Sequence, residues 1–161
     1  MWRRAATSCP SVLEAVLELN RRLKPHKEKG AFLPFAQLMD LFAEYPVVVG
    51  CGHPFRAPGH VPELPEEQLC RLQFLDLNGK DLALDRERTE RLTYGLGKRL
   101  QIPVVSGSDT HQAVQYGCVA TVFENACDTI PALYGEMLAG RYEIRLSGCA
   151  ALQVRTACLL K

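Results

Sequence analysis

Side chains that commonly bind metal ions follow two hydrophobic segments of this sequence. The stretch VVSGSDTH, residues 104–111, ends in Asp109 and His111, and His53 comes directly after VVVGCG, residues 47–52. Imidazole nitrogens and carboxylate oxygens bind zinc, manganese and iron, and an ion with an open coordination position can activate water. His53, Asp109 and His111 are therefore candidate ligands of a divalent metal.

The same residues also have a purely structural interpretation. Gly-Ser-Asp-Thr is common in turns and at helix N-termini, where Asp109 would accept backbone N–H bonds. His53 precedes Pro54 and could be a hydrogen-bonded residue at the end of a strand. The spacing alone leaves both interpretations open.

Three predicted strands must position the candidate ligands. Residues 47–52, 73–79 and 102–107 form short hydrophobic runs, and residues 85–101 between the last two have helical leucine spacing. Strands that alternate with helices form right-handed crossovers and hence a largely parallel sheet, whose ligand site lies beyond the carboxyl ends of the strands. His53, Asn78, Asp109 and His111 are expected along one such edge.

The rest of the chain divides into a helical N-terminal extension, residues 1–46, and an α/β domain, residues 47–161. The extension contains predicted helices within residues 8–23 and 35–45, joined by a charged connection. After the candidate site, the pattern predicts a strand over 117–123, a helix that begins at Asp128 or Thr129 and ends at Gly140, and strands over 141–146 and 151–160.

Composition narrows the classes of protein to be considered. The chain has 161 residues, 47% of them hydrophobic, and a formal net charge of +1, so it can build a core and carries no strong nucleic-acid signal. It contains no apolar run of membrane-spanning length and no leader pattern. Its seven cysteines include no C-x-x-C pair, which favours free thiols and a cytoplasmic location.

Three segments together resemble the second half of the PHP family (polymerase and histidinol phosphatase), including its C-terminal PHP-associated segment. They are VVVGCGHPFR, FLDLNGKD and LQIPVVSGSDTHQAVQYGCVATVF, and the similarity runs from about residue 47 to residue 146. The resemblance implies a partial or distorted (β/α)7 barrel whose strand ends hold two or three metal ions for phosphoester hydrolysis. It implies that His53 is the ligand of the H-P motif, that Asp109 and His111 are the closing ligand pair, and that Asp76 is structural.

The chain departs from that family in its remaining ligands. It contains no H-x-H motif and only four histidines: His26, His53, His60 and His111. We therefore expect a PHP-like metal-dependent phosphoesterase, or the C-terminal part of one, with an incomplete zinc, manganese or iron site. The alternative is a non-catalytic PHP-derived binding or assembly module.

Two further expectations concern what the chain binds. Arg56, three residues after His53, is a candidate phosphate-binding residue on grounds of charge. The expected small ligand is a phosphorylated small molecule or a nucleotide. A barrel that lacks several strands would expose the edge of its sheet, which favours a homo-oligomer or a partner chain.

Overall fold

The structure is a computed structural model that describes residues 12–57, 59 and 61–160. His60 lies outside this set. The contacts divide the chain into two units, Met1–Val47 and Val48–Lys161, and each is considered by itself.

The first unit contains two helices, α1 (Val12–Glu28) and α2 (Phe35–Phe42). Within it, Arg22 donates hydrogen bonds to Glu44 at 2.5 Å and to the Tyr45 hydroxyl at 3.2 Å. The first helix ends at Glu28, beyond the predicted end at residue 23, so Pro25 lies inside α1 and not in the connection that follows it.

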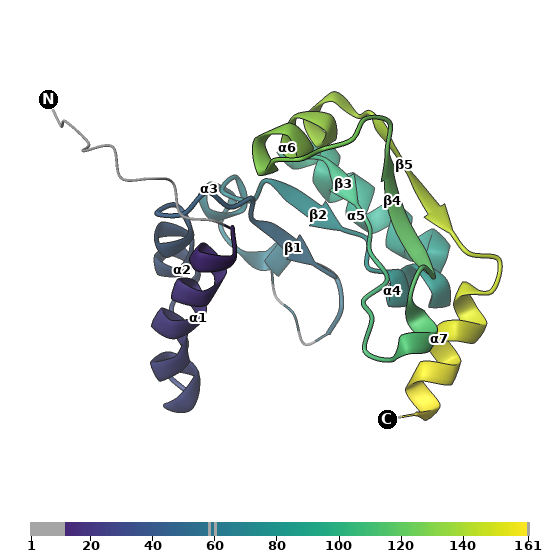
Figure 1. Cartoon of the computed structure of the whole chain (residues 1–161), viewed down its shortest axis with the longest axis horizontal. Helices are drawn as coiled ribbons and strands as arrows, with labels where there is room; N and C mark the ends of the chain where they lie inside the picture. The colour runs from purple at the N-terminus through teal and green to yellow at the C-terminus, as the bar shows by residue number, and fades with distance from the viewer. Residues whose placement is uncertain (1–11, 58, 60, 161) are drawn as a thin grey trace, which may run out of the picture. The chain divides into compact units, whose positions relative to one another are not determined.

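The second unit is built on a three-stranded parallel sheet in the order β1-β2-β3 (Figure 1). The strands are β1 (Gly50–Gly52), β2 (Phe74–Asp76) and β3 (Val104–Val105), with Cys51 opposite Leu75 and Leu75 opposite Val104. Leu75 at the centre is fully buried. The short helix α3 (Glu66–Leu69), where the sequence has EEQLCRL, lies between β1 and β2 in the chain, after a 3-10 turn at Val61–Glu63.

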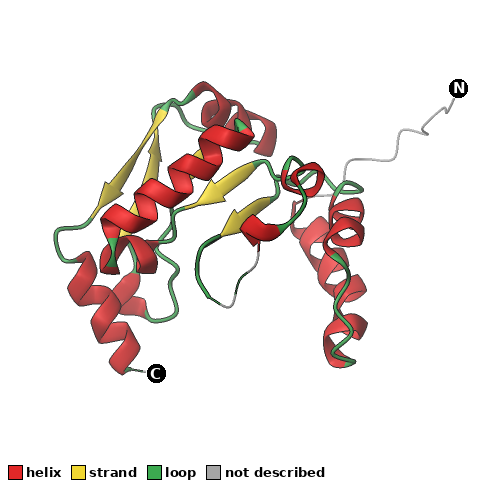
Figure 2. Cartoon of the chain, turned by 180° about the vertical axis from the view of Figure 1, so that it is seen from behind, coloured by secondary structure: helices red, strands yellow, loops and turns green. Residues whose placement is uncertain are grey.

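Two helices return the chain from β2 to β3. These are α4 (Gly79–Leu84) and α5 (Arg86–Leu100), and Figure 2 shows α5 lying across one face of the sheet. A Cβ on Gly97 would come within 2.6 Å of Val104 Cγ2, so glycine at this position lets α5 pack closely on β3. The predicted parallel arrangement of these strands is confirmed.

A two-stranded antiparallel sheet follows, formed by β4 (Val119–Phe123) and β5 (Tyr142–Leu146). Helix α6 (Ile130–Ala139) connects them, with its first turn capped by Thr129, which accepts a hydrogen bond from Ala132 N at 3.2 Å. The Tyr142 hydroxyl donates to the Val104 carbonyl at 2.8 Å and thereby joins the antiparallel pair to β3.

One predicted element is wrong. Residues 151–160 were expected to form a strand, but they belong to α7 (Ala150–Leu159). Its buried residues are Ala150, Val154 and Ala157, which are four and three positions apart and so lie on one helical face.

The fold is therefore mixed α/β. The described residues form seven α-helices, the three-stranded parallel sheet and the separate antiparallel pair, and these strands do not close into a barrel. No helix in the described part of the chain is long and apolar enough to cross a membrane.

Candidate functional site

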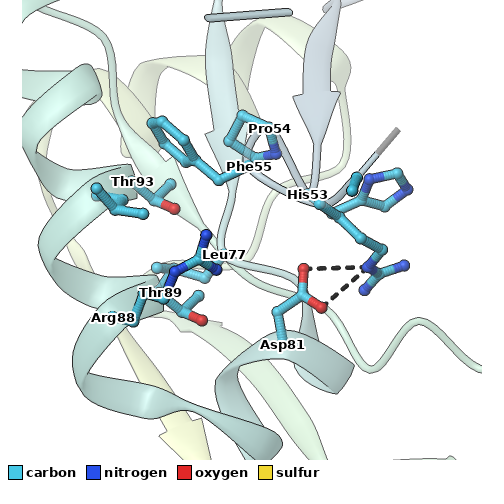
Figure 3. A pocket seen from close by; sticks show the side chains of 11 residues that line it. His53, Pro54, Phe55, Leu77, Asp81, Arg88, Thr89 and Thr93 are labelled. Atoms are coloured by element: carbon cyan, nitrogen blue, oxygen red, sulfur yellow. Dashed lines mark hydrogen bonds and ion pairs between the residues drawn. The ribbon is translucent and has the colours of Figure 1, made fainter. Parts of the chain in front are cut away.

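Arg56 is the centre of a polar cluster beyond the carboxyl ends of the parallel strands. Its Nε donates to Asp81 Oδ1 at 2.9 Å and Oδ2 at 3.2 Å, its Nη1 lies 3.3 Å from Asp109 Oδ2, and its Nη2 donates to Asn78 Oδ1. The Asp81 contacts are visible as dashed lines in Figure 3. One guanidinium thus joins the segments that follow β1, β2 and β3, as parallel topology predicts.

Asn78 connects this cluster to helix α4. Its Oδ1 also accepts from Lys80 N at 3.1 Å and Asp81 N at 3.4 Å, which caps the first turn of the helix. The side chain is almost fully buried. The cap fixes the start of α4 and, with it, the position of the Asp81 carboxylate.

Backbone strain is concentrated at the same edge. Among the described residues other than glycine, four have a positive φ: His53 at 39°, Asn78 at 64°, Asp109 at 51° and Gln101, which ends helix α5. Three of the four therefore follow successive strands of the parallel sheet. Unfavourable backbone conformations of this kind gather where a protein must aim side chains at a site.

His111 is held so that one ring nitrogen remains available. Its Nδ1 lies 2.9 Å from the Asp109 carbonyl oxygen, and because a carbonyl can only accept, Nδ1 carries the proton. The lone pair is then on Nε2. Histidines that ligate metals commonly have their other nitrogen bonded to a carbonyl or carboxylate in this way. The Asp109 Oδ1 atom lies 3.8 Å from Nδ1.

Gln115 is a supporting residue that the sequence analysis missed. Its Oε1 accepts from His111 N at 2.9 Å and Gln112 N at 3.1 Å, and its Nε2 donates to the Asp109 carbonyl at 3.3 Å. It is buried. The sequence gives little indication of this role, because a glutamine four positions after a histidine is not a distinctive pattern. In the structure the Gln115 side chain fixes the loop that carries both candidate ligands.

Asp76 ties the ends of β2 and β3 together beneath the cluster. Its Oδ1 accepts from Asn78 N at 2.9 Å and Gly107 N at 3.2 Å. Burial raises the pKa of this carboxyl above its ordinary value, and the two backbone hydrogen bonds oppose that increase. The nearby charge of Asp109 raises the pKa further, whereas His53 lowers it. The contacts suit the structural role that the PHP resemblance implies for Asp76.

The raised pKa of Asp76 predicts a pH dependence of stability. The folded chain holds this proton more tightly than the unfolded chain, so the stabilisation is complete below the ordinary aspartate pKa of about 3.9 and is lost as the pH rises through the higher folded value. In Asp76→Asn, whose amide oxygen can accept the same two bonds, that loss should disappear. Urea unfolding across this pH range measures the free energy of unfolding of the unaltered chain and of Asp76→Asn. If the two free energies changed in parallel with pH, the expectation would be contradicted.

The candidate ligands are only partly brought together. Asp109 and His111 lie side by side, and His53 follows β1 at the same edge, near enough to Asp76 to affect its pKa. Within the described residues, however, no three His, Cys, Asp or Glu side chains are grouped so that they could hold one ion. The described residues therefore do not by themselves fit a complete metal centre.

Comparison with known proteins gives a likeness of fold. The chain is similar to the crystal structure of PsfC from Pseudomonas syringae PB-5123, with a TM-score of 0.60 and 17% sequence identity. The match covers 81% of this chain and 52% of PsfC, so the chain spans about half the length of that protein. No protein-family model matches the sequence. No curated protein matches it either.

Proposed function

We propose that this chain is a PHP-type module that supplies one part of a divalent metal site for phosphoester hydrolysis. The observation that carries the proposal is the arrangement at the end of β3, where Asp109 lies beside a His111 ring whose Nδ1 is bonded to a carbonyl. His53 and Asp109 add strained backbone at the same edge. Together these features support the proposal.

Each residue has a distinct proposed role. His53, Asp109 and His111 are ligands, but not all three of one ion, because they are not grouped around one position. The remaining ligands come from residues outside the described set or from another chain. The metal, which is zinc, manganese or iron, would supply a bound water that ionises near neutral pH. Arg56 binds the phosphoester through the two guanidinium N–H groups that its bonds to Asp81, Asp109 and Asn78 leave free.

Manganese-induced broadening of NMR signals tests this assignment of ligands. When Mn²⁺ is added to the labelled chain, the amide signals of residues 52, 53 and 107–111 should broaden first, and those of α6 should not. In Asp109→Asn the Mn²⁺ concentration needed for half of the effect should rise about tenfold or more. His26→Ala, which removes a histidine of α1, is the matched control and should leave that concentration unchanged. Uniform broadening, or an unchanged midpoint in Asp109→Asn, would contradict the proposal.

A second candidate function is a non-catalytic binding or assembly module. It is favoured by Arg56, whose guanidinium already contacts the side-chain oxygens of Asn78, Asp81 and Asp109. The cluster can therefore be stable without a metal ion. Among the described strands β1 pairs only with β2, so its other edge could accept a strand from a second copy or a partner chain.

Turnover of a simple phosphomonoester separates the two candidates. A module without catalysis should not hydrolyse para-nitrophenyl phosphate in the presence of Zn²⁺, Mn²⁺ or Fe²⁺. Hydrolysis that needs one of these ions and is abolished by His111→Ala would eliminate this second candidate.

A further inference from the structure

A cavity of about 270 Å³ lies beside the polar cluster, between the segment after β1 and helix α5 (Figure 3). The segment contributes His53, Phe55 and Arg56, and α5 contributes Arg88, Thr89 and Thr93. Of these six residues, only His53 and Arg56 belong to the proposed metal and phosphoester site. Asp81, which also lines the cavity, is paired with Arg56, and the other lining residues have no assigned role.

Arg88 gives the cavity an uncompensated positive charge. Its backbone N–H donates to Asp85 Oδ1 at 3.2 Å, but its guanidinium forms no hydrogen bond or ion pair with any residue that the structure describes. Figure 3 shows this side chain turned into the cavity. Arg56, by contrast, is paired with Asp81 and Asp109. Arg88 is therefore the cation that remains for a ligand.

Two hydroxyl groups accompany this charge. Thr89 and Thr93 are four positions apart on α5, hence on the same face, and they line the same cavity. The two residues are 9% and 2% exposed. Within the described chain neither hydroxyl has a side-chain hydrogen-bond partner. Each hydroxyl can therefore donate a hydrogen bond to a group bound in the cavity.

Apart from Asp81, whose carboxylate is paired with Arg56, the rest of the wall is apolar. Pro54 and Phe55 lie on one side of the cavity, and Leu77 and Leu92 line it as well. A site that combines one cation and a few hydroxyls with an apolar wall is typical of pockets for small organic anions. The volume suits a ligand of about the size of one substituted ring.

We infer that this cavity binds a small organic phosphate, with its phosphate against Arg88, Thr89 and Thr93 and its apolar or aromatic part against Phe55. A guanidinium that pairs with two oxygens leaves a phosphate a third free oxygen for the hydroxyls, whereas a carboxylate has only the two oxygens that the guanidinium engages. The inference goes beyond the proposed function, because this binding requires no metal ion.

Titration with phenyl phosphate in the presence of EDTA tests the inference. We expect saturable binding, with a dissociation constant that rises about tenfold or more in Arg88→Met through loss of a charged hydrogen-bonding partner. Arg91→Met, an exposed arginine one turn along the same helix, should bind like the unaltered chain. Phe55→Ala should weaken the binding of phenyl phosphate but not that of inorganic phosphate.

Two results would overturn the inference: no saturable binding, or equal binding by Arg88→Met, whether or not Arg56→Met also binds. The Mn²⁺ experiment is independent of these outcomes, because Arg88 is not among the proposed ligands. Failure here and failure of the proposed metal site are thus distinguishable.

Discussion

Gly79→Ala is expected to lower the free energy of unfolding by about 2–3 kcal/mol. A Cβ at this position would lie 2.6 Å from the Gly107 carbonyl oxygen and 2.9 Å from Ser108 Cα. Both are backbone atoms, and Gly79 N donates to that same carbonyl at 2.8 Å, so the loop after β3 cannot move away without breaking the bond. The change would also displace the loop that carries Asp109.

The matched control is Gly95→Ala. Gly95 lies within α5, and a Cβ there would meet no atom within 4 Å. Alanine is the better helix former, so this variant should gain about 0.5–1 kcal/mol. Urea unfolding of the two variants gives the comparison directly. If both variants changed the free energy of unfolding in the same direction, the close contact between Gly79 and the loop after β3 would not explain the effect of Gly79→Ala.

The second large effect is expected at Arg56. In Arg56→Met the carboxylates of Asp81 and Asp109 and the amide oxygen of Asn78 lose the cation that they share. Breaking a buried ion pair costs several kcal/mol, but the Arg56 side chain is 26% exposed, so we expect a loss of about 1–2 kcal/mol.

Two further variants decide whether charge is the cause of that loss. Asp81→Asn combined with Arg56→Met should recover part of the stability, because one uncompensated carboxylate is removed. Arg91→Met, at an exposed position of α5, should leave the urea midpoint nearly unchanged. An Arg56→Met protein as stable as the unaltered chain would show that the cluster contributes little.

Local patterns in the sequence predicted most of the α/β unit. The β-branched runs at 47–52 and 102–107 became parallel strands, and Thr129 and Gly140 marked the two ends of α6. Residues 151–160 were assigned wrongly because their apolar residues fit a strand and a helix almost equally well. Burial against neighbouring elements favours the helix. The most extensive contacts of α7 are with α4 and with the 3-10 turn at Ala113–Gln115.

The candidate site was predictable only in outline. Topology alone implied that three residues follow parallel strands at one edge of the sheet: His53, Asp109 and His111. The pairing of Arg56 with Asp81, 25 residues further along the chain, depends on long-range packing that no local pattern reveals. The PHP barrel and the phosphoesterase activity rest on the sequence resemblance and stay predictions, and the similarity to PsfC adds the fold alone.

The central claim is that His53, Asp109 and His111 form part of a divalent metal site. Its most direct test is elemental analysis by mass spectrometry of the purified chain after dialysis against Zn²⁺ or Mn²⁺, beside the His53→Ala, Asp109→Ala, His111→Ala triple variant. We predict metal bound to the unaltered chain and its loss from the triple variant, with circular dichroism confirming that both are folded. Equal metal content in the two proteins, whether high or absent, would contradict the claim.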